Sequence, residues 1–236
     1  MRSLVIYIGL AMGCLGFAFP GNDFEVKHLG ALRNMMHKGD ISAKGALRDF
    51  ENQPHLFGLG AVEDLKGEIL ILDGKPYITS VVEGEIETDQ SFEKNATLFV
   101  YAQVEAWTEI KIPRKIKSYA QLESFVEQAA QKQGIDTELA FPFLVEGQLG
   151  AGDWHVIDWP EGDTEHTHEK HIQSGLNGTI SNEKVKILGF WSNKHHAIFT
   201  HHTTNMHLHF RTEDGRLAGH LDDLKLGRKM KLMLPK

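Results

Sequence analysis

The sequence predicts a mixed α/β (α+β) fold made of two closely packed β-rich halves. Helical patterns occur only before residue 140, among strand patterns, so a mixed sheet with helices is expected in the N-terminal part. Short strand patterns between turn residues fill the C-terminal part, which favours a mostly antiparallel sheet or barrel there. The composition, with 41% hydrophobic and 24% charged residues, is that of a globular protein.

The first part of the chain alternates between helical and strand patterns. Residues 24–50 carry apolar side chains at helical spacing with one break, and predict two short helices. Residues 67–78 predict a hairpin, because Asp73-Gly74 is a strong turn signal between two strand patterns. Residues 97–107 predict a further strand.

The clearest helix is expected at 119–133. Ser118 is a suitable N-cap, Gln121 three residues later completes a capping box, and Gly134 follows the last turn. The rest of the chain predicts strands at 141–149, 185–191, 206–211 and 217–224, with a polar loop at 161–178.

The start of the chain resembles a secretory signal. Arg2 supplies a positive charge, and the run from Leu4 to Phe19 is apolar or small before polar residues follow. We therefore expect residues 1–18 to be removed and the product to be exported, periplasmic or secreted. A lipid anchor at Cys14 is the alternative, since the four residues before it loosely resemble a lipoprotein cleavage site. A spanning anchor would need about 20 apolar residues.

The remaining chain, 19–236, is expected to form a single unit with approximate sub-halves 24–139 and 140–236. Cys14 is the only cysteine, so a chain cleaved after Ala18 has no thiol for a disulfide or for a metal. The formal charge of −7 argues against a nucleic-acid partner, because phosphate binding needs a basic face. The sequence leaves the oligomeric state open, with a homodimer as one alternative.

Three histidines form the strongest candidate site. Alternate side chains share one face of a strand, so His207 and His209 are expected to point the same way. A turn at 212–216 permits a return strand that brings His220 to that face. Three neutral imidazoles that leave coordination positions open are the ligand set of a catalytic zinc (Zn²⁺) site. Two acidic residues nearby are candidate partners of these ligands: Asp222 and Asp223. A solvated strand face is the alternative for the His-x-His pattern.

Eleven of the fourteen histidines lie at or after His155, so imidazoles are concentrated in this region. Seven of them have no assigned role: His166, His168, His171, His195, His196, His201 and His202. Solvated loop positions are the simple interpretation, and a second metal site or a pocket rim is the alternative.

The histidine motif and several landmarks resemble the α-acetolactate decarboxylase family. His207-Leu208-His209-Phe210, an acidic turn and Gly219-His220-Leu221-Asp222 are similar to the zinc-binding segments of that family in sequence and spacing. Further similar stretches follow the family's order along the chain: residues 55–60, 65–68, 72–77, 141–147 and 188–190. The resemblance extends from about Phe24 to the end of the chain.

The resemblance implies a function. It implies Zn²⁺ bound by His207, His209 and His220, and conversion of 2-acetolactate, a small 2-hydroxy-3-keto acid, to acetoin and CO₂. It also implies a part in proton transfer for Glu68, since the family has a glutamate in this stretch. In such a reaction a Lewis acid stabilises the enolate-like carbanion, and a proton donor then quenches it.

The chain departs from the family at two places. The family has an arginine thought to grip the substrate carboxylate, and alignment without gaps places His155 there. A protonated histidine can bind a carboxylate but is not a bidentate fork. The family also has a glutamate near its C-terminus, whereas residues 226–236 contain no acidic residue. Two alternatives therefore stay open: an exported, non-catalytic zinc-binding homologue, and a metal-dependent enzyme of the same fold with a different small keto or hydroxy acid substrate.

The N-terminal segment yields the first prediction. Expressed in its native host, the protein should begin after Ala18 and be found outside the cytoplasm, because residues 1–18 have the order of a cleavable signal. N-terminal sequencing and the mass of the purified chain measure this. A chain that begins at Met1 would contradict the prediction.

Overall fold

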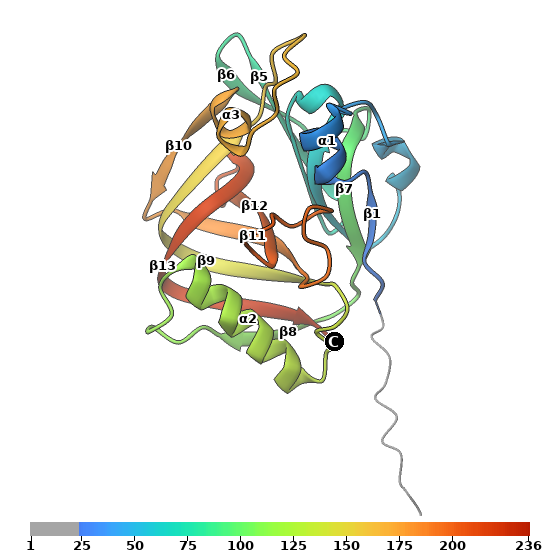
Figure 1. Ribbon diagram of the computed structural model, residues 1–236. Helices are drawn as coiled ribbons and strands as arrows, with labels where there is room; N and C mark the ends of the chain where they lie inside the picture. The colour runs from blue at the N-terminus through green and yellow to red at the C-terminus, as the bar shows by residue number, and fades with distance from the viewer. Residues whose placement is uncertain (1–23) are drawn as a thin grey trace, which may run out of the picture.

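The structure of the protein, a computed structural model, describes residues 24–236. The expected signal segment 1–18 and the lipidation alternative at Cys14 lie outside these residues. Two β-sheets packed against each other form the body of the protein, with a few short helices around them (Figure 1). The predicted mixed α+β class is confirmed. Within residues 24–236, no helix is long and apolar enough to cross a membrane.

The first sheet is formed by the N-terminal part of the chain. Its strands lie in the order β1 (Lys27–Leu29), β7 (Asn95–Gln103), β3 (Leu56–Val62), β4 (Glu68–Leu72), β5 (Lys75–Val82) and β6 (Glu85–Asp89), with β2 (Gly45–Ala46) also on β7. Every pairing in it is antiparallel, which corrects the expectation of a mixed sheet here. The reason is that short turns connect β3 through β6, and such turns join antiparallel neighbours.

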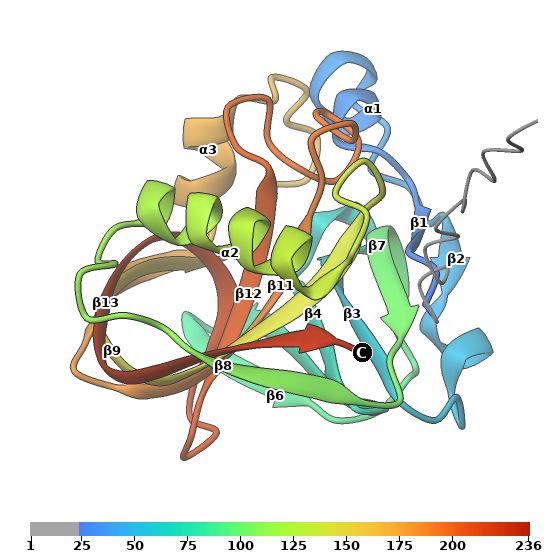
Figure 2. The same ribbon diagram turned by 90° about the horizontal axis from the view of Figure 1, so that it is seen from below.

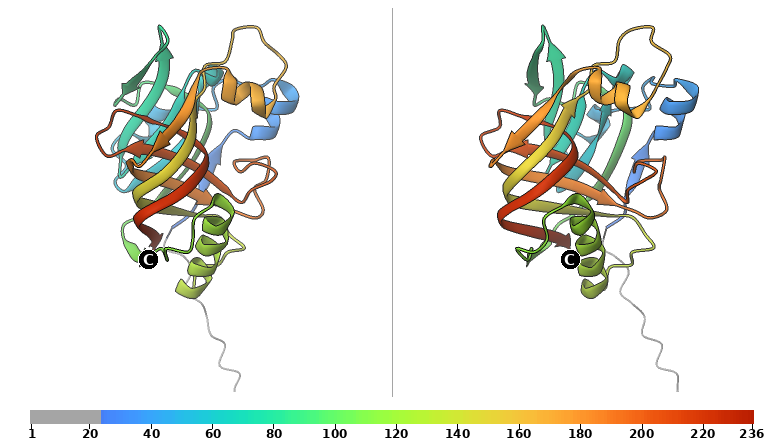
Figure 3. Two further views of the ribbon diagram at one scale, coloured as in Figure 1. Left: turned by 90° about the vertical axis from the view of Figure 1, so that its left-hand side faces the viewer. Right: turned by 60° about the vertical axis from the view of Figure 1, so that its left-hand side comes forward.

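The second sheet closes on itself as a barrel. Its strands lie in the order β10 (Leu176–Ser181), β9 (Phe141–Val156), β11 (Lys184–Trp191), β12 (Met206–Thr212), β13 (Ala218–Pro235) and β8 (Trp107–Lys111), and β13 also pairs with β9. The long strands β9 and β13 curve beside each other (Figure 3). Helix α2 (Tyr119–Gln133) packs against the barrel (Figure 2).

Several local predictions are confirmed by the backbone. Helix α2 has the capping box formed by Ser118 and Gln121, and it ends at Gly134 in the left-handed conformation. Asp73 and Gly74 both have positive φ, as expected for the tight hairpin turn between β4 and β5.

Other local predictions are wrong because tertiary pairing overrides local propensity. Residues 24–50 contain the strands β1 and β2 as well as α1 (Leu32–Lys38) and the 3₁₀ turn η1 (Leu47–Phe50). A second 3₁₀ turn, η2 (Glu63–Leu65), follows β3. The loop expected at 161–178 contains the short helix α3 (His168–Gln173) and the start of β10. The segment 97–107 divides between β7 and β8, which belong to different sheets, so the chain passes between the sheets well before residue 139.

The apolar layer between the two sheets positions the site. Side chains of β3, β4 and β7 meet those of β9 and β11 there: Leu59, Leu70 and Leu98 on one side, and Leu144, Leu188 and Phe190 on the other. Because side chains alternate along a strand, the opposite faces point into two other cores, one inside the barrel and one behind the first sheet.

Two glycines in the family-like stretches allow close packing. A Cβ atom at Gly60 would lie 2.0 Å from the carbonyl oxygen of Leu98, and one at Gly189 would lie 2.2 Å from the ring of Phe143. Any larger residue would force the neighbouring strand or ring away, which explains glycine at both positions.

Candidate metal centre

Strand register aligns three histidines in a row across the barrel. His209 on β12 is directly opposite His220 on β13, and His220 is in turn opposite His155 on β9. Residues directly opposite each other on paired strands point to the same face. His207, two residues before His209, shares that face as well. All four imidazoles therefore point toward the first sheet, from which Glu68 on β4 faces them.

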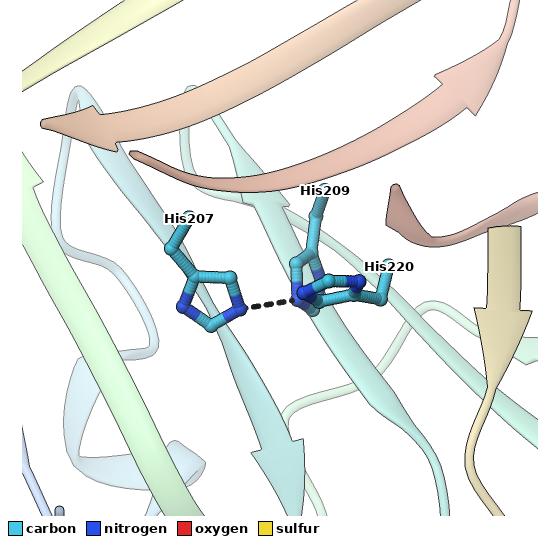
Figure 4. Close-up of side chains that lie close together, drawn as sticks. All are labelled: His207, His209 and His220. Atoms are coloured by element: carbon cyan, nitrogen blue, oxygen red, sulfur yellow. Dashed lines mark hydrogen bonds between the residues drawn. The ribbon is translucent and has the colours of Figure 1, made fainter. Parts of the chain in front are cut away.

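The three predicted ligands converge. His207, His209 and His220 each offer one nitrogen, and these atoms all lie within 4.8 Å of one another. The Nε2 atoms of His207 and His209 are 3.2 Å apart, and His220 lies beside His209 (Figure 4). His207 and His209 are buried, with 9% and 0% of their surface exposed, and His220 is half-buried.

The residues present fit a divalent metal ion. The Nδ1 atoms of His207 and His209 are buried and have no hydrogen-bond partner, whereas Nδ1 of His220 lies 3.0 Å from a carboxylate oxygen of Asp222. Burial lowers the pKa of His207 and of His209 well below the ordinary value, so both rings are neutral at neutral pH. Neutral imidazoles with free lone pairs are the donors that zinc and similar metals prefer.

Glu68 is a buried carboxyl beside this cluster, with 4% of its surface exposed. Its oxygens lie 3.6 Å from His209 Nε2 and 3.5 Å from His155 Nε2, and the amide of Ile157 donates a hydrogen bond to it at 3.3 Å. Burial raises the pKa of Glu68 to about 8, although His220 and the Ile157 amide act in the opposite direction. In metal-free protein Glu68 therefore holds a proton at neutral pH, as a general acid must.

Asp222 supports two of the histidines. Its carboxylate accepts a hydrogen bond from His155 Nδ1 at 2.8 Å and lies 3.0 Å from His220 Nδ1. Burial alone would raise the pKa of Asp222, but the adjacent His220 and His155 hold it below the usual range, so the carboxylate is ionised. The bond to His155 Nδ1 leaves Nε2 of that ring directed at Glu68. His155, His220 and Asp222 also form a second group of close potential metal ligands. Because Asp222 already binds His155, we interpret this carboxylate as a group that orients the histidine rings rather than as the ligand of a second metal ion.

A cavity of about 340 Å³ opens onto these residues. One side is apolar, with side chains from α1 and both sheets: Leu32, Met35, Leu65, Leu98, Phe199 and Leu208. Among residues 24–236, no lysine or arginine lines the cavity, but the acidic residues Glu68 and Asp222 do. An anionic substrate would therefore meet positive charge only from a bound metal or a protonated histidine.

The structure brings together every candidate site residue that the sequence suggested: Glu68, His155, His207, His209 and His220. Among the seven unassigned histidines, His168, His171 and His201 line the cavity. The rest lie outside its lining: His166 contacts His171, His195 and His196 bond to Ser192 and Asn205, and His202 lies beside His201. Sequence reasoning missed Tyr119 and the apolar wall, since no motif marks residues contributed singly by separate elements.

The fold and the site define a β-rich protein with a buried three-histidine centre of the kind that metalloenzymes use. The chain belongs to the α-acetolactate decarboxylase family, whose model matches residues 24–235.

Solved structures of similar proteins share the fold. The α-acetolactate decarboxylase from Bacillus subtilis strain 168 is 15% identical, with 90% of this chain and 86% of that chain covered and a TM-score of 0.71. A Staphylococcus aureus protein described as similar to α-acetolactate decarboxylase and of unknown function is 12% identical, with 89% and 84% covered and a TM-score of 0.68. No curated protein sequence matches this chain.

The buried proton on Glu68 predicts a pH dependence of stability. The pKa of Glu68 rises from 4.5 to about 8 on folding, so its contribution to the free energy of unfolding is lost as pH rises toward 8. Between pH 6.5 and 8, this contribution of Glu68 should fall by about 2 kcal/mol in metal-free protein, at about 1.4 kcal/mol per pH unit. The lowered pKa values of His207 and His209 act in the opposite direction, because the unfolded rings lose protons over the same range, so the loss is read as the difference between the wild type and Glu68→Gln.

Urea unfolding of metal-free protein at both pH values measures this loss. Glu68→Gln should abolish it, and Glu87→Gln, at an exposed carboxylate, should leave it unchanged. A wild-type pH slope in Glu68→Gln would show that Glu68 titrates normally.

Proposed function

We propose that this protein is a zinc-dependent carboxy-lyase that converts 2-acetolactate, or a close 2-hydroxy-3-keto acid, to the hydroxyketone and CO₂. The observation that carries the proposal is the meeting of three converging imidazoles and one buried carboxyl of raised pKa in a single cavity. Membership of the α-acetolactate decarboxylase family supports it.

The residues divide the work of such a reaction. His207, His209 and His220 would hold the metal, and when bound this ion supplies Lewis-acid stabilisation of the negative charge that develops as CO₂ leaves. The bond to the carboxylate carbon breaks, and its electron pair passes into an enediolate. Glu68 then delivers its proton to carbon, and a proton from water restores the acid.

His155 is proposed to face the substrate carboxylate. It lines the cavity, which holds no guanidinium or ammonium group of residues 24–236, and Asp222 fixes the orientation of its ring. The neutral state of Glu68 also favours binding of an anionic substrate, because an ionised carboxyl at this position would repel it.

A different substrate of the same class is the second candidate function. It is favoured by the imidazole of His155 in place of the family arginine, since a single ring nitrogen grips a carboxylate less specifically than a bidentate fork. A reaction on a keto or hydroxy acid with another carboxylate position would use the same proton donor.

Metal binding yields the next prediction. The purified protein should bind about one Zn²⁺ per chain, and His207→Ala should abolish this binding, because one of three converging ligands is lost. Elemental analysis and competition with a chromophoric chelator measure the occupancy. His37→Ala, at an exposed position on α1, serves as the control and should bind like the wild type. A wild-type protein that takes up no zinc would overturn the metal assignment.

Turnover tests the proposal itself. Zinc-loaded protein should release acetoin and CO₂ from 2-acetolactate, and Glu68→Gln should lower kcat by roughly 100-fold or more while zinc stays bound, because the proton donor is lost. His155→Ala should chiefly raise KM, and His155→Arg should restore it. Fully metallated protein that leaves 2-acetolactate unchanged but acts on related keto acids would support the second candidate function. Inactivity toward all of them would support the non-catalytic zinc-binding alternative.

A further inference from the structure

A second group of imidazoles lies at the mouth of the cavity. His168 is the first residue of α3, and His201 and His202 lie in the loop between β11 and β12. The ring centroids of His168 and His201 are 4.7 Å apart, and those of His201 and His202 are 4.0 Å apart. The three rings of the buried centre are spaced at 5.0 to 5.2 Å. Neighbouring rings of this mouth group are therefore at least as close to each other as the rings of the buried centre.

These histidines connect solvent with the buried centre. His202 and His168 are exposed, His201 is half-buried, and His168 and His201 line the same cavity as His207 and His220. Two separate segments of the chain contribute to the group, so it is not a by-product of one histidine-rich stretch.

The state of these rings suits metal capture. Thr203 Oγ1 lies 2.8 Å from His201 Nδ1, a hydrogen bond that leaves Nε2 of that ring available. Burial first, and then the nearby His168 and His202, lower the pKa of His201 to about 4, and burial also lowers the pKa of His168. Both rings are thus neutral at neutral pH and can donate a lone pair.

We propose that His168, His201 and His202 form a metal-capture site that takes Zn²⁺ from solution and passes it to His207, His209 and His220. The inference rests on the zinc binding put forward under the proposed function. Among residues 24–236, nitrogens of the mouth group do not meet within the 4.8 Å that unites the buried ligands. Such an arrangement holds an ion through one or two rings at a time, which suits transfer more than permanent binding. A hydrated ion can exchange its waters for imidazoles in steps on the way to a buried centre.

The rate of zinc uptake tests this proposal. Metal-free protein is mixed with limiting Zn²⁺ in a stopped-flow instrument, and a chromophoric chelator reports the free ion. Replacement of His168, His201 and His202 together by alanine should slow filling of the buried centre about tenfold, the low end of the range over which on-rates vary among variants of one site. The final occupancy should be unchanged, because the three buried ligands remain.

Control variants separate the possible failures. His37→Ala should load at the wild-type rate, and His207→Ala should never fill. A second variant with glutamine at residues 168, 201 and 202 keeps the side chains polar and should also load slowly, which guards against a folding defect in the alanine variant. Wild-type loading rates in both triple variants would overturn the capture site and leave the proposed function standing. If the wild type takes up no zinc at all, the proposed function fails, and the capture site with it.

Discussion

The site depends on one constraint, the pairing of β13 with two partners at once. Because β13 bonds to β12 on one side and to β9 on the other, His220 is placed between His209 and His155 in a single cross-strand row. A shift of register by one residue would turn its imidazole to the opposite face. Closure of the barrel thus fixes the positions of His209, His220 and His155. Glu68 faces them from the first sheet.

Burial between the sheets then sets the chemistry. The same removal from water that keeps His207 and His209 neutral also keeps a proton on Glu68, since low-dielectric surroundings penalise every charged form. Asp222 stays ionised because imidazoles lie next to it. Neutral imidazoles, a protonated acid and one ionised carboxylate therefore coexist in one small cavity, and no lysine or arginine of residues 24–236 lines it.

Among residues 24–236, no arginine or lysine lines the cavity. His155 lines the cavity, and its hydrogen bond to Asp222 fixes the orientation of the ring, which leaves a single ring nitrogen to contact a ligand. The imidazoles of His168 and His201 lie in the same lining, so positively charged groups in this part of the structure can come from histidines.

Local chemistry in the sequence determined several parts of this protein. The capping box of Ser118 and Gln121 defined α2, Asp73-Gly74 defined a turn, and the alternation of His207 with His209 defined two donors on one strand face. These features depend on neighbours within a few residues, which is why sequence reasoning could find them. The tertiary structure alone decided the antiparallel first sheet, the strands within residues 24–50, the contact of Asp222 with His155, and the cavity that His168 and His201 share with Glu68. Those features join segments far apart in the chain, and their formation depends on strand register and on the packing of two sheets, which no local pattern encodes.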